Sequence, residues 1–237
     1  LSEKVAIHIN DTHPALCIPE LMRILMDEYE VSWEQAWDLT SKVMSYTNHT
    51  IMAEALEKWP TYLMKRSLPR MYQIIKEIDR RYVVSMSGIH DAALIERTRI
   101  IQGEEIHMAN LAIIGSHSTN GVAKLHSDLL KAVVLHDFYT IYPERFNNKT
   151  NGIAQRRWLQ LSNEPLSRVL DETIGQSWRH EPADLKLLMN YQNDPIVLEK
   201  LAKAKHQKKE ELAKYIQETT GIIVNPTAIF DVQIKRL

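Results

Sequence analysis

The first thirty residues show a short apolar run followed by an apolar pattern of helical period. Residues 5–9 predict a strand, and Thr12 with Pro14 then sets up a helix over residues 15–29. The polar residues 10–13 therefore lie where a strand passes into a helix. In a parallel sheet this is the edge at which ligands bind.

Most of the remaining chain carries apolar residues three and four positions apart, which predicts helices. Helices are expected after Ser32, from about Met52, from Pro69, from Arg156 to about Thr173, and from Asp194-Pro195 to Gly221. The last and longest is expected to bury Leu198, Leu201, Leu212 and Ile216. Residues 83–105 are poorly patterned and predict little beyond a connection. Strands alternating with helices are typical of an α/β fold.

A polar segment over residues 115–128 lies between an apolar, strand-like run at residues 111–114 and a helical pattern from Val122 to Val133. Such a junction is where α/β proteins bind ligands. Its two glycines are six apart and no Gly-Lys-Ser/Thr follows, so a nucleotide loop is not indicated. Simple helix capping by its serines and Asn120 remains an equal alternative.

Composition narrows the class of protein. The 237 residues, 44% of them hydrophobic, suffice for one large domain or parts of two. The 29 basic and 30 acidic side chains nearly cancel, so neither nucleic acid nor a membrane is an expected partner. A single cysteine, Cys17, is typical of a reducing cytoplasm and predicts a cytoplasmic location. We expect Cys17 to be a buried structural thiol.

The two ends of the chain both resemble pieces of a sheet. The chain opens directly into a strand, and residues 229–234 alternate apolar and polar like a half-buried strand. We therefore expect a portion of a larger protein. Lys235 and Arg236 follow this last strand, where they are placed for an anionic ligand such as phosphate or are simply solvated charges.

Four polar segments around Asp11, His49, Asn120 and Asn151 share amides, hydroxyls and imidazoles with few charges. Neutral, hydroxyl-rich ligands such as sugars need many directed donors and acceptors but little net charge, so this composition suits them. No zinc-type spacing of histidines or cysteines occurs, and a metal site is not expected. A two-carboxylate hydrolase, with Asp11 opposite Glu54 or Glu57, is a weaker alternative.

Several of these segments match one known family in order along the whole chain. The matching motifs are INDTHPAL at residues 9–16, IPELMR at 18–23, YTNHT at 46–50, EALEKWP at 54–60, GSH at 115–117, NGVAK at 120–124, NKTNGI at 148–153, RRW at 156–158 and FDVQIKR at 230–236. Because of these motifs, the chain resembles the α-glucan phosphorylases, which include glycogen, starch and maltodextrin phosphorylases. Residues near 83–105 look shorter than in animal members.

The resemblance implies an α/β fold of two Rossmann-like domains that face each other across a cleft, the glycosyltransferase-B-type architecture. Residues 1–151 would be the C-terminal part of the first domain, and residues 152–237 the start of the second, cofactor-binding domain. Large parts of both domains would lie outside this chain. The parent enzyme is expected to be a homodimer and allosteric, and the sequence does not choose between glycogen, starch and maltodextrin.

The activity implied by the resemblance is phosphorolysis, in which orthophosphate cleaves the terminal α-1,4 link of a glucan and α-D-glucose 1-phosphate is released. Asn151 and His49 would hold the glucose and Val122 would line its pocket. Three further residues would border that pocket, namely Asp11, His13 and Glu57.

The resemblance also implies pyridoxal 5′-phosphate as the cofactor. Lys235 and Arg236 would hold the cofactor phosphate and the substrate phosphate, and Trp158 would pack beside the cofactor. No lysine here matches the family's cofactor-bearing motif, so we expect this chain alone to bind no cofactor covalently and to be inactive. The alternative is a non-catalytic sugar-binding or partner-docking module that retains the fold.

Overall fold

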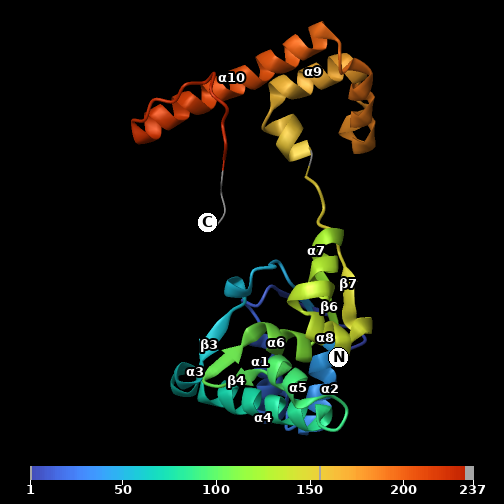
Figure 1. Cartoon of the computed structure of the whole chain (residues 1–237), viewed down its shortest axis with the longest axis vertical. Coiled ribbons are helices and arrows are strands. Elements are labelled where there is room, and N and C mark those ends of the chain that lie inside the picture. Colours follow the sequence, from blue (N-terminus) through green and yellow to red (C-terminus); the bar gives the residue numbers. More distant parts are fainter. Residues whose placement is uncertain (1, 155, 233–237) are drawn as a thin grey trace. The chain divides into compact units, whose positions relative to one another are not determined.

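The computed structural model describes residues 2–154 and 156–232 of the chain (Figure 1). The chain forms two compact units, Leu1–Asn151 and Gly152–Leu237. The first unit is an α/β structure with a parallel sheet, as the sequence predicts. The assignment of the two units to the two Rossmann-like domains remains a prediction.

A four-stranded parallel sheet organises the first unit. Its order is β1-β2-β6-β7, with bounds Ile7–Asn10, Met44–Thr47, Ser118–Gly121 and Phe146–Asn148. Each strand pairs in parallel with the next, and the register aligns Asn10 with Thr47, Thr47 with Asn120, and Gly121 with Asn148. The ends of all four strands therefore lie at one edge of the sheet.

Helical crossovers connect the strands, as parallel pairing requires. Between β1 and β2 run α1 (Cys17–Arg23), a π-helical turn (Ile24–Glu28) and α2 (Trp33–Val43). Between β6 and β7 run α7 (Lys124–Leu129), a second π-helical turn (Leu130–Val134), α8 (His136–Ile141) and a 3₁₀ turn (Pro143–Arg145).

The connection from β2 to β6 is the longest and holds four α-helices. It contains a 3₁₀ turn (Ala53–Ala55), α3 (Thr61–Ser67), α4 (Pro69–Met86), α5 (Ala92–Thr98) and α6 (Met108–Ile114). Three short strands within it, β3 (Lys58–Pro60), β4 (Ile101–Gln102) and β5 (Glu105–His107), form an antiparallel sheet in the order β3-β5-β4.

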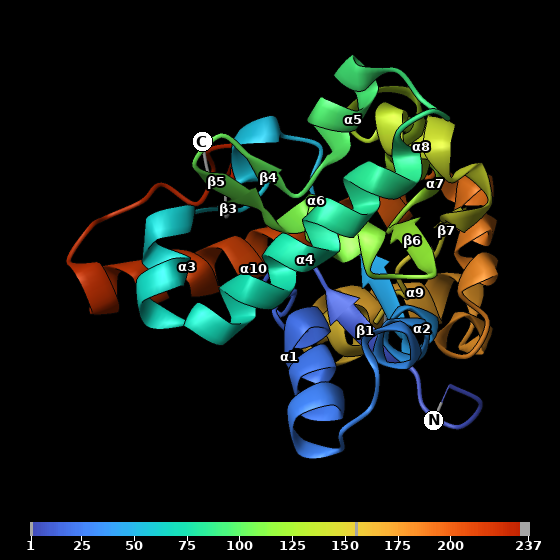
Figure 2. The same ribbon diagram turned by 90° about the horizontal axis from the view of Figure 1, so that it is seen from below.

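The core of the first unit lies between the parallel sheet and the helices packed beside it (Figures 1 and 2). The strands contribute fully buried Ile9 and Tyr46, and α1 contributes Ile18. From α4 come Ile74 and Ile75, three and four positions after Met71, so one stripe of this helix faces the core. This apolar packing fixes the strand ends that carry the polar segments.

The predicted strand at residues 111–114 is wrong, because these residues are the end of α6. Every residue of α6 is buried, so the segment is apolar on all sides and its period gives no indication of a helix. The strand is instead β6, within the polar segment, where fully buried Thr119 alternates with partly exposed neighbours. The helical pattern after it is also less buried than predicted, since Leu125 and Val133 are exposed.

Three other segments of the first unit differ from the sequence-based predictions. The helix expected from about Met52 is instead a 3₁₀ turn, Ala53–Ala55, followed by the strand β3. Residues 83–105 hold the end of α4, all of α5 and the strand β4, rather than a plain connection. Residues 146–148, expected to belong to a loop, form β7. These elements are too short for a periodic signal, and they are stabilised by pairing and packing with segments distant in the sequence.

In the second unit, over residues 152–154 and 156–232, every described element of secondary structure is a helix or helical turn. It contains a π-helical segment (Arg156–Leu161), α9 (Glu164–Ile174), 3₁₀ turns (Ser177–Arg179 and Pro182–Tyr191) and α10 (Pro195–Thr220). The Asp194 carboxylate caps α10 by accepting from the amides of Ile196 and Val197, and Gly221 ends it with a φ of 75°.

The predicted buried face of α10 is wrong. Leu198 and Leu212 are exposed and Leu201 and Ile216 are half-buried, whereas the buried residues of this helix are Val197 and Ala204. The strand predicted over residues 229–234 is absent from its described part, residues 229–232, and Ile229 is 96% exposed. A strand needs a second strand as its hydrogen-bonded neighbour, and the described part of this unit contains no strand.

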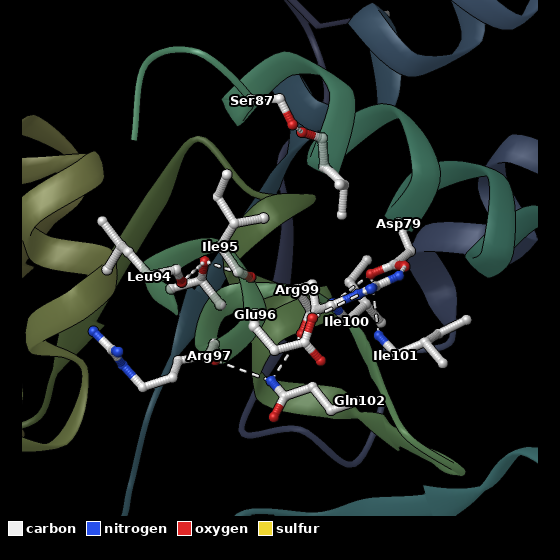
Figure 3. A network of polar contacts seen from close by, with 12 residues as sticks. Asp79, Ser87, Leu94, Ile95, Glu96, Arg97, Arg99, Ile100, Ile101 and Gln102 are labelled. Carbon is white, nitrogen blue, oxygen red and sulfur yellow. Dashed lines mark hydrogen bonds and ion pairs between the residues drawn. The ribbon is translucent and has the colours of Figure 1, made fainter. Parts of the chain in front are cut away.

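A buried carboxylate ties α4 to the segment that follows α5 (Figure 3). Asp79 accepts from the Arg99 guanidinium at 2.6 Å, from the Ile100 amide at 2.7 Å and from the Ile101 amide at 3.1 Å. Its side chain is only 4% exposed, while Arg99 remains partly exposed and can reach water. Beside it, the Gln102 amide donates to the carbonyls of Arg97 and Arg99.

Replacing Asp79 by alanine should lower the free energy of unfolding by about 3–5 kcal/mol, because it leaves two amides and a cation without their buried acceptor. Urea unfolding of the first unit, followed by circular dichroism, measures this. Glu96→Gln is the matched control, because Glu96 also pairs with Arg99 but is 61% exposed, and it should cost at most about 1 kcal/mol. Equal midpoints for the two variants would contradict this role of Asp79.

Candidate functional site

The four polar segments meet at one edge of the parallel sheet, where the carboxyl ends of its strands lie. We call this the carboxyl edge and define it as residues 10–13, 47–50, 120–122 and 148–151. Thr47 and Asn120, which are 73 positions apart in the sequence, thus become neighbours. It is the edge at which open α/β sheets bind their ligands.

A chain of side-chain hydrogen bonds crosses three strands just before this edge. The Thr47 hydroxyl donates to Oδ1 of Asn120 at 2.7 Å, and Nε2 of His8 lies 2.5 Å from the same hydroxyl oxygen. Because Thr47 has only one hydrogen to donate, the His8 nitrogen must donate to it. These hydrogen bonds hold β1, β2 and β6 in register.

His49 projects from the turn after β2 and is oriented by β1. Its Nε2 lies 2.6 Å from Oδ1 of Asn10, so this nitrogen donates and the ring direction is fixed. The turn itself depends on Asn48, which is fully buried. The Asn48 amide donates to the Tyr46 hydroxyl at 3.1 Å and its Oδ1 accepts from the Thr50 amide at 2.9 Å.

Tyr46 completes this support as a neutral hydroxyl. Burial raises its pKa well above the ordinary range, so the phenol keeps its proton at any physiological pH. His49 itself remains exposed. The site thus presents the His49 imidazole to solvent on a turn that the buried residues Asn48 and Tyr46 hold in place.

Thr12 joins the acidic residues at the β1 end of the carboxyl edge. Its amide donates to Oδ1 of Asp11 at 2.8 Å, and its hydroxyl donates to Glu57 at 2.8 Å. The Trp59 indole donates to the other Glu57 oxygen at 2.7 Å. Both Glu57 oxygens therefore accept internal donors, an arrangement that suits a supporting acceptor better than the proton-transferring acid of the hydrolase alternative.

Asp11 adopts a left-handed backbone conformation with a φ of 62°. Aspartate tolerates this region better than most residues, yet the conformation is uncommon and often marks a functional turn. Nε2 of exposed His13 lies 4.0 Å from Oδ2 of Asp11. Asp11, His13 and Glu57 therefore all lie close to Thr12.

Val122 connects the ends of β6 and β7. Its carbonyl accepts from the Asn151 amide at 3.0 Å, and the Gly121 carbonyl accepts from the Lys149 amide at 3.1 Å. Asn151 is exposed, and its position beside Val122 is set by the main chain. The structure thus places Val122 and Asn151 together on the carboxyl edge.

Three of the predicted site residues are not brought to this edge by the described structure. Trp158 belongs to the second unit and is 67% exposed. Lys235 and Arg236 lie outside the described residues. Over residues 2–154 and 156–232, no group of three or more His, Cys, Asp or Glu side chains is placed to hold a metal. No helix in that part is long and apolar enough to cross a membrane.

The cavities of the first unit include one of about 300 Å³, which is lined by residues including Glu57, Lys58 and His107. Burial lowers the pKa of His107, which favours its neutral form. Another cavity, of about 670 Å³, is lined by residues including Trp33, Trp37 and Arg145, none of which belongs to the carboxyl edge.

Comparison with known proteins decides the family. A family model described as "Carbohydrate phosphorylase" matches residues 1–237. The chain belongs to the carbohydrate phosphorylase family. Glycogen phosphorylase of Bacillus subtilis is 53% identical over 239 residues, which cover 100% of this chain and 30% of that protein. The muscle forms of glycogen phosphorylase from mouse and human are 44% and 42% identical, each over 99% of this chain and 28% of the relative.

The chain therefore spans about 30% of the length of the curated relatives it matches. The match over its whole length confirms the resemblance inferred from the motifs. The individual roles of His49, Asn151, Val122, Asp11, His13 and Glu57 in that family remain predictions.

Sequence reasoning missed the residues that support the site. Asn10, Thr47 and His126 lie within or beside the recognised motifs, yet no role is predicted for them. Each of them has a partner 39 to 76 residues away, which only the three-dimensional structure reveals. In the sequence, the one sign of such supporting residues is a polar residue at the end of each strand.

Gly121→Ala should destabilise the first unit by about 1–3 kcal/mol through overpacking. A Cβ at Gly121 would lie 2.5 Å from Oγ of Ser127 and 3.0 Å from its Cα, and moving that hydroxyl would break its 2.9 Å bond to Asn148. Gly152→Ala is the control, because nothing lies within 4 Å of its added Cβ. Thermal unfolding measures both, and an unchanged midpoint for Gly121→Ala would show that the packing is looser than described.

Proposed function

We propose that the full-length protein containing this segment is an α-glucan phosphorylase. Orthophosphate would attack C1 of the terminal glucose, a phosphate oxygen would bond to C1 as the C1–O4 link breaks, and the departing O4 would take up a proton. The products are α-D-glucose 1-phosphate and a glucan one residue shorter. One observation supports this most: a carbohydrate phosphorylase sequence gathers uncharged donors and acceptors at the carboxyl edge.

In this proposal His49 and Asn151 bind the hydroxyls of the terminal glucose. The Asn10–His49 contact holds the imidazole in one direction before the sugar arrives, which lowers the entropy lost on binding. Val122 packs against the sugar ring beside Asn151. Asp11, His13 and Glu57 border the pocket at the β1 end.

The family also suggests the larger architecture. We propose that the first unit is the end of one Rossmann-like domain and the second unit the start of another, in the glycosyltransferase-B arrangement. The sequential parallel order β1-β2-β6-β7 supports the first assignment. A homodimer and a cytoplasmic location belong to the same proposal.

Pyridoxal 5′-phosphate is proposed as the cofactor of the full-length enzyme on the basis of the family resemblance. The described residues do not form a site for it: Trp158 offers an exposed indole, and Lys235 and Arg236 lie outside the described residues. The 237-residue chain alone is proposed to be inactive, because none of its lysines matches the cofactor-bearing motif of the family.

The proposal is tested by measuring glucose 1-phosphate release from glucan by the full-length protein, with and without orthophosphate. His49→Ala and Asn151→Ala should each lower kcat/KM by roughly 10²–10³-fold, the loss seen when a preorganised polar contact to the transition state is removed. His117→Ala is the control. His117 is an exposed histidine just before β6, at the opposite end of the strand from the carboxyl edge, and its loss should leave activity unchanged.

Activity within a few-fold of wild type for Asn151→Ala would remove its sugar contact from the proposal. A wild-type protein that binds maltooligosaccharides without phosphorolysis would favour the non-catalytic sugar-binding module. Glucan hydrolysis independent of phosphate would instead favour a hydrolase.

A further inference from the structure

His126, in the first turns of α7, lies between two loops of the carboxyl edge. Its Nδ1 accepts from the Val122 amide at 3.1 Å, and its Nε2 makes a longer contact of 3.4 Å with the Thr50 carbonyl. The first contact is local, whereas the second joins residues 76 positions apart. One imidazole therefore connects the loop after β6 to the loop after β2.

The chemistry of the two partners determines the tautomer. A backbone amide can only donate, so Nδ1 carries no proton, and a carbonyl can only accept, so Nε2 carries one. A neutral imidazole offers this acceptor and donor on opposite sides of one rigid ring. Lysine and arginine lack an acceptor, and an ionised carboxylate lacks a donor.

The surrounding packing leaves little freedom for the ring. A Cβ at Gly121 would approach Nδ1 of His126 to 3.0 Å, so the imidazole lies directly against the main chain at the end of β6. The next residue, Ser127, is buried and donates to Oδ1 of Asn148 at 2.9 Å. The start of α7 thus contacts the loops that follow β2, β6 and β7.

The two atoms that His126 holds belong to neighbours of the predicted sugar ligands. Thr50 directly follows His49, and the Val122 carbonyl accepts from the Asn151 amide at 3.0 Å. A displacement of either loop would change the separation of His49 and Asn151. Small displacements of the binding groups strongly reduce the activity of a site that must match one ligand geometry.

We propose that His126 is a positioning residue for the glucose site, which sets the separation of His49 from Val122 and Asn151 as a neutral Nε2–H imidazole. This inference rests on the proposed function, in which those residues bind the sugar. His126 does not contact substrate in this account. It acts through the backbone of Val122 and Thr50.

Two substitutions in the full-length protein separate this role from simple packing. In His126→Asn the amide oxygen takes the place of Nδ1 and can still accept from Val122, but the contact with the Thr50 carbonyl is lost. His126→Phe keeps the ring volume and neither polar atom. The asparagine variant should lose kcat/KM by roughly ten-fold, and the phenylalanine variant should lose roughly 30-fold or more. Activity equal to wild type in either variant would overturn the proposal.

A spectroscopic measurement on wild-type protein keeps the test independent of activity and of variant folding. With ¹⁵N-labelled histidine, the His126 signals should show a protonated Nε2 and an unprotonated Nδ1, and the Val122 amide should exchange slowly with solvent. An Nδ1–H tautomer or a rapidly exchanging Val122 amide would overturn the proposal. If the tautomer is as expected but no phosphorolysis occurs, the proposed function fails while the contact made by His126 stands.

Discussion

The parallel register of β1, β2, β6 and β7 is the constraint on which the rest of the structure depends. It aligns Asn10 with Thr47 and Thr47 with Asn120, so segments distant in the sequence end at the same edge. The apolar core beneath, from Ile9 to Phe146, holds that register because a shift of one residue would turn every buried side chain to the wrong face. The position of each candidate ligand-binding group follows from it.

The polar groups at this edge are mostly engaged with one another across the strands. Thr47 donates to Asn120, His49 contacts Asn10, and Thr12 donates to Glu57. Such contacts remove conformational freedom from the side chains before a ligand arrives, and they do so largely without net charge. A surface of this kind suits a neutral, hydroxylated ligand.

Much of the fold class and the location of the site could be predicted from the sequence. Strong helices such as α4 and α10, and the first strand, carry clear periodic patterns, and polar residues mark the strand ends. The strand β6 could not be predicted, because its pairing with β2 and β7, rather than its composition, makes it a strand. Apolar α6 looked like a strand because it is buried on every side.

The hydrogen-bond partners of these side chains could not be predicted from the sequence for a related reason. The motif containing Asn48 and His49 gives no sign that Asn10 orients the imidazole, and nothing near Val122 indicates that His126 reaches Thr50. These contacts depend on three-dimensional register and on the close approach that Gly121 permits. The residues that would touch the ligand are thus easier to recognise than those that hold them.

The central claim is that the carboxyl edge of this sheet is a glucose site. The most direct test is a crystal structure of the full-length protein with bound α-D-glucose 1-phosphate. The account predicts that the hexose hydroxyls lie about 3 Å from the side chains of both His49 and Asn151, with Val122 against the ring. A hexose bound elsewhere, for example in the cavity beside Trp33 and Trp37, with the carboxyl edge free of ligand, would contradict it.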